Sequence, residues 1–267
     1  MRTHNEQPIA LFDSGIGGLS VLRHVRELLP EEELIYLADS AYTPYGDRSE
    51  QFIIERGLEI GQFFIEQNAK AIVIACNSAT AAAVHMMRQQ LSIPIVGMEP
   101  GIKPAVIQSR NKRVGILATA ATVASDKFTR LAESYGKDVE LSIQACPGLV
   151  EQIEAMAMDS FETRKLLSNY LAPLQEREID TLALGCTHYP FLLPQIREIL
   201  GDAITIIDTG PPVAEQLKRV LGELSALREK SSGGGIKFYA TDVSDTLTKQ
   251  MSELWGEEIE LNSLSSS

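Results

Sequence analysis

The chain has 267 residues, of which 44% are hydrophobic and 22% are charged, and its formal net charge is −12 at neutral pH. This length and balance are typical of a globular protein with a sizeable core, whereas the acidic excess argues against a nucleic-acid partner or an anionic membrane surface. The first residues lack an apolar secretory core and no later apolar run is long enough to span a membrane, so we expect a cytoplasmic protein without a membrane partner.

The first hundred residues alternate short apolar runs with amphipathic stretches, a pattern that predicts parallel strands joined by helices. Each strand ends in polar or glycine-containing residues, which is where α/β folds place their sites. Strands are expected at residues 9–12, 34–38, 72–75 and 93–96, with helices at 19–29 and 49–67 and a third that ends at 91.

A glycine-rich turn follows the first strand, with the sequence Asp13-Ser14-Gly15-Ile16-Gly17-Gly18. Such a turn lets backbone N–H groups approach an anion closely. It has neither a Gly-Lys-Ser/Thr ending nor a complete G-x-G-x-x-G, so a small carboxylate site or a plain tight turn is favoured over a phosphate loop. An ionised Asp13 would repel an anion, which favours a role in handling protons or an ammonium group.

The segment 41–47 follows the second strand and is rich in proline, glycine and tyrosine. This composition predicts a loop. The loop either contributes backbone groups to a ligand or simply connects two elements.

The alternation restarts after residue 112 and echoes the first half at an offset of roughly 110 residues. Asp13 falls against Thr119, and Cys76 falls against Cys186. Strands are expected at 113–118, 139–143, 181–185 and 204–207, and helices from 122 to 135 and at 149–158, 161–176 and 191–200. Two similar α/β lobes with mainly parallel sheets are therefore predicted.

The remaining residues predict a helix at 214–230, a flexible loop at 231–235, a strand at 236–240, a final helix, and disorder from Ser263 onward. We expect this section to return to the first lobe. The predicted domains are then residues 1–98 plus 209–267 for the first lobe and 99–208 for the second, with the active site in the cleft between them.

Cys76 and Cys186 each follow a buried strand directly, and each precedes polar residues. The third cysteine, Cys146, makes an odd total, and a reducing compartment disfavours disulfides. Free cysteines are more often packed as small hydrophobic residues than used as catalysts. The repeated placement at a strand end is what favours a chemical role for the first two.

Four chemistries are compatible with this pair of thiols. A metal site would combine both with His188, but the C-x-x-C and H-x-x-x-H spacings are missing. A redox disulfide also lacks C-x-x-C. A cysteine hydrolase built from Cys186 and His188 would leave Cys76 unused.

The fourth chemistry inverts a stereocentre beside a carboxylate and uses both thiols. One thiolate removes the α-proton while a thiol on the opposite face donates one, and the roles swap for the mirror-image substrate. A thiol pKa of about 8.5 leaves some thiolate at neutral pH, so no cofactor is required. Hydrogen-bonding groups for the substrate are available in the adjoining turns, at Ser14, Asn77, Ser78 and Thr187.

Four motifs in this order resemble those of the glutamate racemases, within the aspartate/glutamate racemase superfamily, and the resemblance extends from about residue 9 to 255. The motifs are Asp13-Ser14-Gly15-Ile16-Gly17-Gly18, Pro44-Tyr45-Gly46, Ala75-Cys76-Asn77-Ser78-Ala79 and Gly185-Cys186-Thr187-His188-Tyr189-Pro190. The resemblance implies an isomerase with no cofactor and no metal, which converts L-glutamate to D-glutamate for peptidoglycan synthesis and cell-wall formation. It also implies two pseudo-symmetric lobes and a homodimer.

The resemblance also assigns roles to individual residues. Cys76 and Cys186 are the acid/base residues, with Asp13 assisting the first and His188 the second. The expected substrate-binding residues are Asp13, Ser14, Tyr45, Gly46, Asn77, Ser78, Thr187, His188 and Glu151.

Three positions differ from the family pattern or lack a role in it. Ser78 stands where threonine is frequent, and 119–122 lacks the usual Pro-Gly turn. Cys146 has no catalytic counterpart, and we expect it to pack in the core. An aspartate racemase or related isomerase, and a non-catalytic amino-acid-binding or regulatory protein, are the alternatives.

Overall fold

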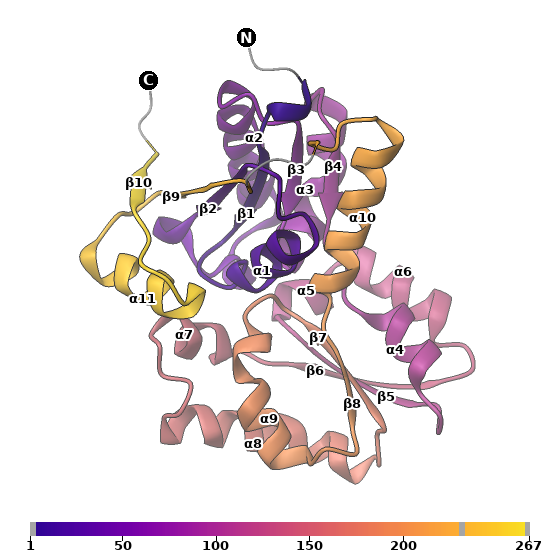
Figure 1. The fold of residues 1–267 in the computed structure, drawn as a ribbon. Coiled ribbons are helices and arrows are strands. Elements are labelled where there is room, and N and C mark those ends of the chain that lie inside the picture. Colours follow the sequence, from indigo (N-terminus) through magenta and orange to yellow (C-terminus); the bar gives the residue numbers. More distant parts are fainter. Residues whose placement is uncertain (1–3, 230–232, 265–267) are drawn as a thin grey trace. The chain divides into compact units, whose positions relative to one another are not determined.

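The structure is a computed structural model that describes residues 4–229 and 233–264. The chain forms two compact units, one made of Met1–Met98 with Gly210–Ser267 and the other of Glu99–Thr209. Each unit has its own parallel sheet with helices packed against it (Figure 1). The predicted α/β fold class with parallel sheets is therefore confirmed.

The first unit is built on a six-stranded sheet in the order β10-β9-β2-β1-β3-β4, and all of its strand pairs are parallel. Its strands are β1 (Ile9–Asp13), β2 (Leu34–Ala38), β3 (Ala71–Ile74), β4 (Ile95–Gly97), β9 (Ile236–Ala240) and β10 (Leu261–Ser263). Its helices are α1 (Leu19–Leu28), α2 (Glu50–Glu66), α3 (Asn77–Gln90), α10 (Gly210–Glu223) and α11 (Asp245–Trp255), with short 3-10 turns η1 (His4–Glu6), η2 (Ser40–Tyr42) and η3 (Tyr45–Asp47).

Both faces of this sheet are covered, because β1, β2 and β3 are buried along their whole length. Phe12 and Ile74 join the apolar residues of α2 and α3 in one core cluster. On the other face, Tyr36 and Phe238 meet edge-on at 6.3 Å, Phe238 contacts Trp255 of α11, and α1 packs against α10 and α11. The carboxyl edge of the sheet is left as the natural place for a site.

The second unit is built on a four-stranded parallel sheet in the order β6-β5-β7-β8. One face carries a core cluster with α7, α8 and α9, and the other carries a cluster with α4 and α6. The strands are β5 (Arg113–Ala118), β6 (Glu140–Ala145), β7 (Thr181–Gly185) and β8 (Thr205–Ile207). The helices are α4 (Ile102–Gln108), α5 (Ala120–Ala124), α6 (Asp126–Tyr135), α7 (Leu149–Glu154), α8 (Phe161–Glu176) and α9 (Leu193–Leu200), with a 3-10 turn η4 (Tyr189–Leu192).

Several predicted helix boundaries are wrong. The helix expected at 214–230 begins at Gly210 and ends at Glu223. It begins earlier than expected because the two prolines after Gly210 fit the first turn, where a backbone N–H has no partner within the helix. The helix expected from 122 to 135 is two helices, divided at Ser125, whose side chain accepts a bond from Phe128 N at 3.2 Å and starts α6. The helix expected at 149–158 ends at Glu154, and part of the one expected at 191–200 is the 3-10 turn η4.

The C-terminal residues also differ from the prediction. Ser263, where disorder was expected to begin, is the last residue of β10, which pairs with β9. Residues 265–267, residues 231–232 of the expected flexible loop and residue 230 of the expected helix lie outside the described residues. Strand β9 pairs with β2, so the chain does return to the first sheet.

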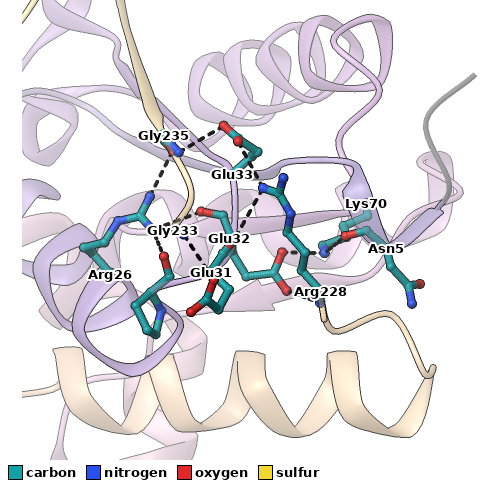
Figure 2. Close-up of polar contacts among 10 residues, drawn as sticks. Asn5, Arg26, Glu31, Glu32, Glu33, Lys70, Arg228, Gly233 and Gly235 are labelled. Atoms are coloured by element: carbon teal, nitrogen blue, oxygen red, sulfur yellow. Dashed lines mark hydrogen bonds and ion pairs between the residues drawn. The ribbon is translucent and has the colours of Figure 1, made fainter. Parts of the chain in front are cut away.

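Three consecutive glutamates hold the segment that leads into β9 (Figure 2). Glu32 is buried and accepts hydrogen bonds from Lys70 Nζ at 2.5 Å and from the Arg228 backbone at 2.9 Å. Glu33 accepts from Arg228 Nη1 at 3.0 Å and Gly235 N at 3.1 Å, and Glu31 accepts from Gly233 N at 3.2 Å. These side-chain bonds therefore hold the segment after α10 against the loop before β2, in addition to the pairing of β9 with β2.

The Lys70 ammonium group is fully buried in this cluster. Besides Glu32, it donates to the backbone oxygens of Asn5 at 2.8 Å and Ala226 at 2.9 Å. Burial lowers the pKa of Lys70, while the bond to Glu32 and its charge oppose that change. A buried ammonium group is tolerated here because three acceptors surround it.

Candidate functional site

In the first unit, the ends of three neighbouring strands bring polar residues together. The Asp39 backbone donates to Asp13 O at 2.9 Å, and the Ala75 backbone donates to Phe12 O at 2.8 Å. The residues that follow β2 and β3 are therefore held next to the end of β1. Asp13 ends β1, and Cys76 lies between β3 and α3.

The glycine-rich turn after β1 is closed by its own carboxylate. Asp13 Oδ2 accepts a hydrogen bond from Gly18 N at 2.7 Å. A Cβ atom on Gly18 would lie 2.7 Å from the Asp13 Cβ, so only glycine permits this approach. Because the Gly18 amide serves Asp13, this turn is a device for fixing a carboxylate, and it is not built as a phosphate loop.

Cys76 lies in the same cluster and is only 5% exposed. Its Sγ is 3.9 Å from Ser14 Oγ, and Ser14 Oγ is 3.5 Å from Asp13 Oδ1. The contacts are long, but they form a continuous path from thiol to hydroxyl to carboxylate. A carboxylate reached through one hydroxyl is a suitable partner for a group that gives and takes protons.

Asn77 and Ser78 begin α3 directly after Cys76, and both are buried. Within the described residues, neither the oxygen nor the nitrogen of the Asn77 amide has a hydrogen-bond partner. Buried amides in proteins are almost always bonded, and an unbonded one calls for an explanation. The expected role of Asn77 in substrate binding stays a prediction, and it would give this amide its partners.

The predicted loop after β2 lies against this cluster, and Tyr45 is its most buried residue. The Tyr45 ring belongs to the same apolar core as Cys76, and its hydroxyl donates to Asp39 Oδ2. Burial raises the pKa of Tyr45, and the Asp39 charge raises it further. Tyr45 is thus a permanent donor to Asp39. The loop can still offer a ligand the backbone groups of Tyr45 and Gly46 and the buried hydroxyl of Thr43, which has no hydrogen-bond partner within the described residues.

In the second unit, Cys186 follows β7 and is also 5% exposed. His188 Nδ1 lies 3.7 Å from Cys186 Sγ and 3.4 Å from Thr187 Oγ1. His188 is 2% exposed, and its Nε2 lies 2.6 Å from Glu154 Oε1. A thiol, an imidazole and a carboxylate are therefore arranged in line.

The electrostatics of this line favour a charged imidazole. Burial by itself lowers the pKa of His188, but hydrogen bonds with Cys186 and Glu154 and their negative charges raise it well above its ordinary value. The two ring nitrogens of His188 face Cys186 and Glu154, an arrangement that favours a doubly protonated imidazole.

Glu154 was missed by the sequence prediction, which named Glu151. Glu151 is exposed, and Glu154 is the residue that contacts His188. Val150 and Ile153 mark the buried side of α7, and Glu154, four residues after Val150, borders that side, whereas Glu151 lies away from it. The helical periodicity was the signal that could have distinguished the two.

Cys146 lies in the core cluster of the second unit with Cys186. Burial raises the pKa of Cys146 to about 12, and the charge of a nearby Cys186 thiolate acts in the same direction. It therefore remains a thiol at neutral pH, in agreement with the packing role expected for it. None of the three cysteines, all of which lie in the described part of the chain, forms a disulfide bond.

The described residues contain neither a metal-binding cluster nor a membrane-spanning helix. Over the ranges 4–229 and 233–264, no three His, Cys, Asp or Glu side chains are grouped as a metal ion would require. No helix among the described residues is long and apolar enough to cross a membrane.

Comparison with known proteins identifies the family to which this chain belongs. A family model for Asp/Glu/hydantoin racemases matches residues 18–217. The glutamate racemase of Methylococcus capsulatus is 46% identical over 253 residues, which cover 95% of this chain and 93% of that protein. Among solved structures, the glutamate racemase isoform RacE1 of Bacillus anthracis has a TM-score of 0.90 at 29% identity and covers 98% of this chain and 99% of its own.

A second structure shows a ligand. The glutamate racemase of Francisella tularensis, solved in complex with D-glutamate, has a TM-score of 0.85 at 30% identity and covers 98% of both chains. Sequence and fold agree over nearly the whole length, and the family model matches residues 18–217. The chain belongs to the Asp/Glu/hydantoin racemase family, and the protein is an isomerase.

Proposed function

We propose that this protein interconverts L- and D-glutamate with two thiols, Cys76 and Cys186, and without a cofactor, and that the D-glutamate serves peptidoglycan synthesis. One observation carries the proposal: each unit has a buried thiol within two residues of the end of a parallel strand, next to a polar side chain that can exchange protons with it. The name of the relative from Methylococcus and the D-glutamate in the Francisella structure support glutamate as the substrate. The resemblance to this family also supports a cytoplasmic homodimer.

The proposed reaction consists of two proton transfers at the α-carbon. A thiolate takes the α-proton, so that a C–H bond breaks, an S–H bond forms, and the electron pair is shared with the substrate carboxylate. The other thiol then gives its proton to the opposite face and becomes the thiolate. For the mirror-image substrate the same two groups act in the reverse order.

The surroundings of the two thiols differ in a way that suits this cycle. Cys186 lies beside His188, whose imidazole has a pKa raised well above its ordinary value. Cys76 lies at the end of a path through Ser14 to the Asp13 carboxylate. Each thiol therefore has its own partner for exchanging protons, as a two-base reaction requires.

The substrate's polar groups are assigned to the turns around each thiol. In the first unit, Ser14, Ser78 and the unpartnered amide of Asn77 supply hydrogen bonds, and the backbone of Tyr45 and Gly46 adds to them. In the second unit, Thr187 supplies a hydroxyl. Hydrogen bonds that strengthen as charge moves onto the substrate carboxylate lower the barrier to removing the α-proton.

The test is a cofactor-free assay. The purified protein is incubated with L- or D-glutamate in heavy water, circular dichroism follows optical activity, and NMR follows deuterium at the α-carbon. Both enantiomers should approach the racemic mixture with deuterium incorporated. A protein that binds glutamate without exchanging its α-proton would be a binding protein, and faster turnover of aspartate would identify an aspartate racemase.

A further inference from the structure

Asp39 is a wholly buried carboxylate to which the sequence motifs assign no role. It follows β2 directly, and its backbone N–H donates to Asp13 O at 2.9 Å. Its position is thereby fixed next to the end of the strand that carries Asp13. A buried carboxylate at the carboxyl edge of the sheet needs partners, and the structure provides three.

The partners of Asp39 are two nitrogens of Arg56 and the hydroxyl of Tyr45. Arg56 Nη2 donates to Oδ1 at 2.6 Å and Nε donates to Oδ2 at 3.0 Å, which is the two-pronged geometry that fixes a carboxylate most firmly. The Tyr45 hydroxyl donates to Oδ2. Arg56 comes from α2 and is 7% exposed, so the pair is shielded from water.

The same guanidinium group holds a second point of the loop. Arg56 lies over the ring of Tyr42 at 4.4 Å from its centroid. Tyr42 and Tyr45 thus attach both 3-10 turns of the loop, η2 and η3, to one ion pair. On the solvent side, Arg56 Nη1 lies 2.5 Å from Glu59, whose side chain is 64% exposed.

This loop also adjoins the first thiol. Tyr45 and Cys76 belong to one apolar core, and η3 contacts α3, which begins directly after Cys76. A shift of Tyr45 would therefore move the backbone of Gly46 relative to Cys76. Small displacements of substrate-positioning groups are costly in binding and in reaction rate.

We propose that Asp39 and Arg56 are positioning residues, whose ion pair holds Tyr45 so that the backbone of the Pro44–Gly46 loop binds the amino-acid substrate beside Cys76. The inference rests on the proposed function, because it concerns affinity for that substrate. It predicts an effect on the KM for glutamate, since neither residue handles the α-proton.

The principal test is Tyr45→Phe, which keeps the ring and removes only the hydroxyl. The KM for glutamate should rise about tenfold, as expected for loss of a hydrogen bond to a charged group, while kcat changes less than about twofold. Arg56→Lys, which keeps the charge and loses the two-pronged geometry, should act in the same direction. Hydrogen exchange should become faster across residues 39–48 and stay unchanged in α3.

Glu59→Gln is the matched control. It removes the exposed carboxylate from the same guanidinium group and leaves the bonds to Asp39 in place, so KM and loop exchange should not change. The inference is overturned if Tyr45→Phe leaves KM unaltered, lowers kcat alone, or leaves hydrogen exchange of 39–48 at the wild-type rate. Hydrogen exchange of the loop is measured without substrate, so it tests the positioning role independently of activity. If the wild-type protein fails to racemise glutamate, the proposed function is overturned, and the exchange result still decides whether Asp39 and Arg56 hold the loop.

Discussion

His188 Nε2 lies 2.6 Å from Glu154 Oε1, and the other ring nitrogen faces the Cys186 thiol at 3.7 Å. One carboxylate on α7 therefore orients the imidazole and supports its positive charge. Glu151, one turn earlier on the same helix, is exposed. The two glutamates form a natural pair of test and control for the role of His188.

Glu154→Gln should lower kcat by roughly 10- to 100-fold, because a neutral amide orients His188 but no longer supports its charge beside Cys186. Glu151→Gln should leave kcat unchanged. Racemisation followed by circular dichroism measures both. Equal losses in the two variants, or a loss in Glu151→Gln alone, would contradict this role of Glu154 and support Glu151, the residue named from the sequence.

The raised pKa of His188 predicts how stability depends on pH. The imidazole gains its charge more readily in the folded protein, so its contribution is fully present below about pH 6.5, the ordinary histidine value, and is lost as pH rises through the raised folded value. In Glu154→Gln the folded pKa is lower, and the loss should begin at lower pH. Urea unfolding at a series of pH values compares the two proteins, and superimposable profiles would argue against a charged His188.

The two-thiol mechanism predicts a specific pattern in cysteine variants. Cys76→Ser and Cys186→Ser should each abolish conversion of both enantiomers, while the remaining thiol still exchanges the α-proton of one enantiomer with solvent. Cys146→Ala should retain activity, since its thiol is buried in the core and has a pKa of about 12. NMR of both enantiomers in heavy water measures the exchange. Conversion that survives loss of Cys76 or of Cys186 would exclude the mechanism.

The buried pair of Lys70 and Glu32 predicts a large effect on stability. Lys70→Met leaves the Glu32 carboxylate buried without its cation and should lower the free energy of unfolding by about 3–5 kcal/mol. Lys70→Met combined with Glu32→Gln should cost less, because no unpaired charge remains. Arg219→Met removes an exposed pair with Glu223 and should change stability by about 0–1 kcal/mol. Urea unfolding measures the free energy of unfolding of all three variants. A double variant that is less stable than Lys70→Met would contradict this account.

The sequence by itself determined the parallel strands, the thiol at the end of one strand in each half, and the glycine-rich turn at Asp13. These features depend on local order, because an apolar run of four or five residues predicts a buried strand and the residue after it must lie at the carboxyl edge. The motif resemblance also depends only on local order, and the family assignment confirms it.

Only the tertiary structure decided which side chains are partners. Asp39 and Arg56 are 17 residues apart, Glu32 and Lys70 are 38 apart, and Glu154 and His188 are 34 apart. Hydrogen bonds form over about 3 Å, so they depend on how whole helices and strands pack, which local patterns do not specify. Helical periodicity could indicate which glutamate of α7 borders its buried side, but it could not identify His188 as the partner of Glu154. Glu154 and Asp39 each act through a residue that is distant in the chain and adjacent in space.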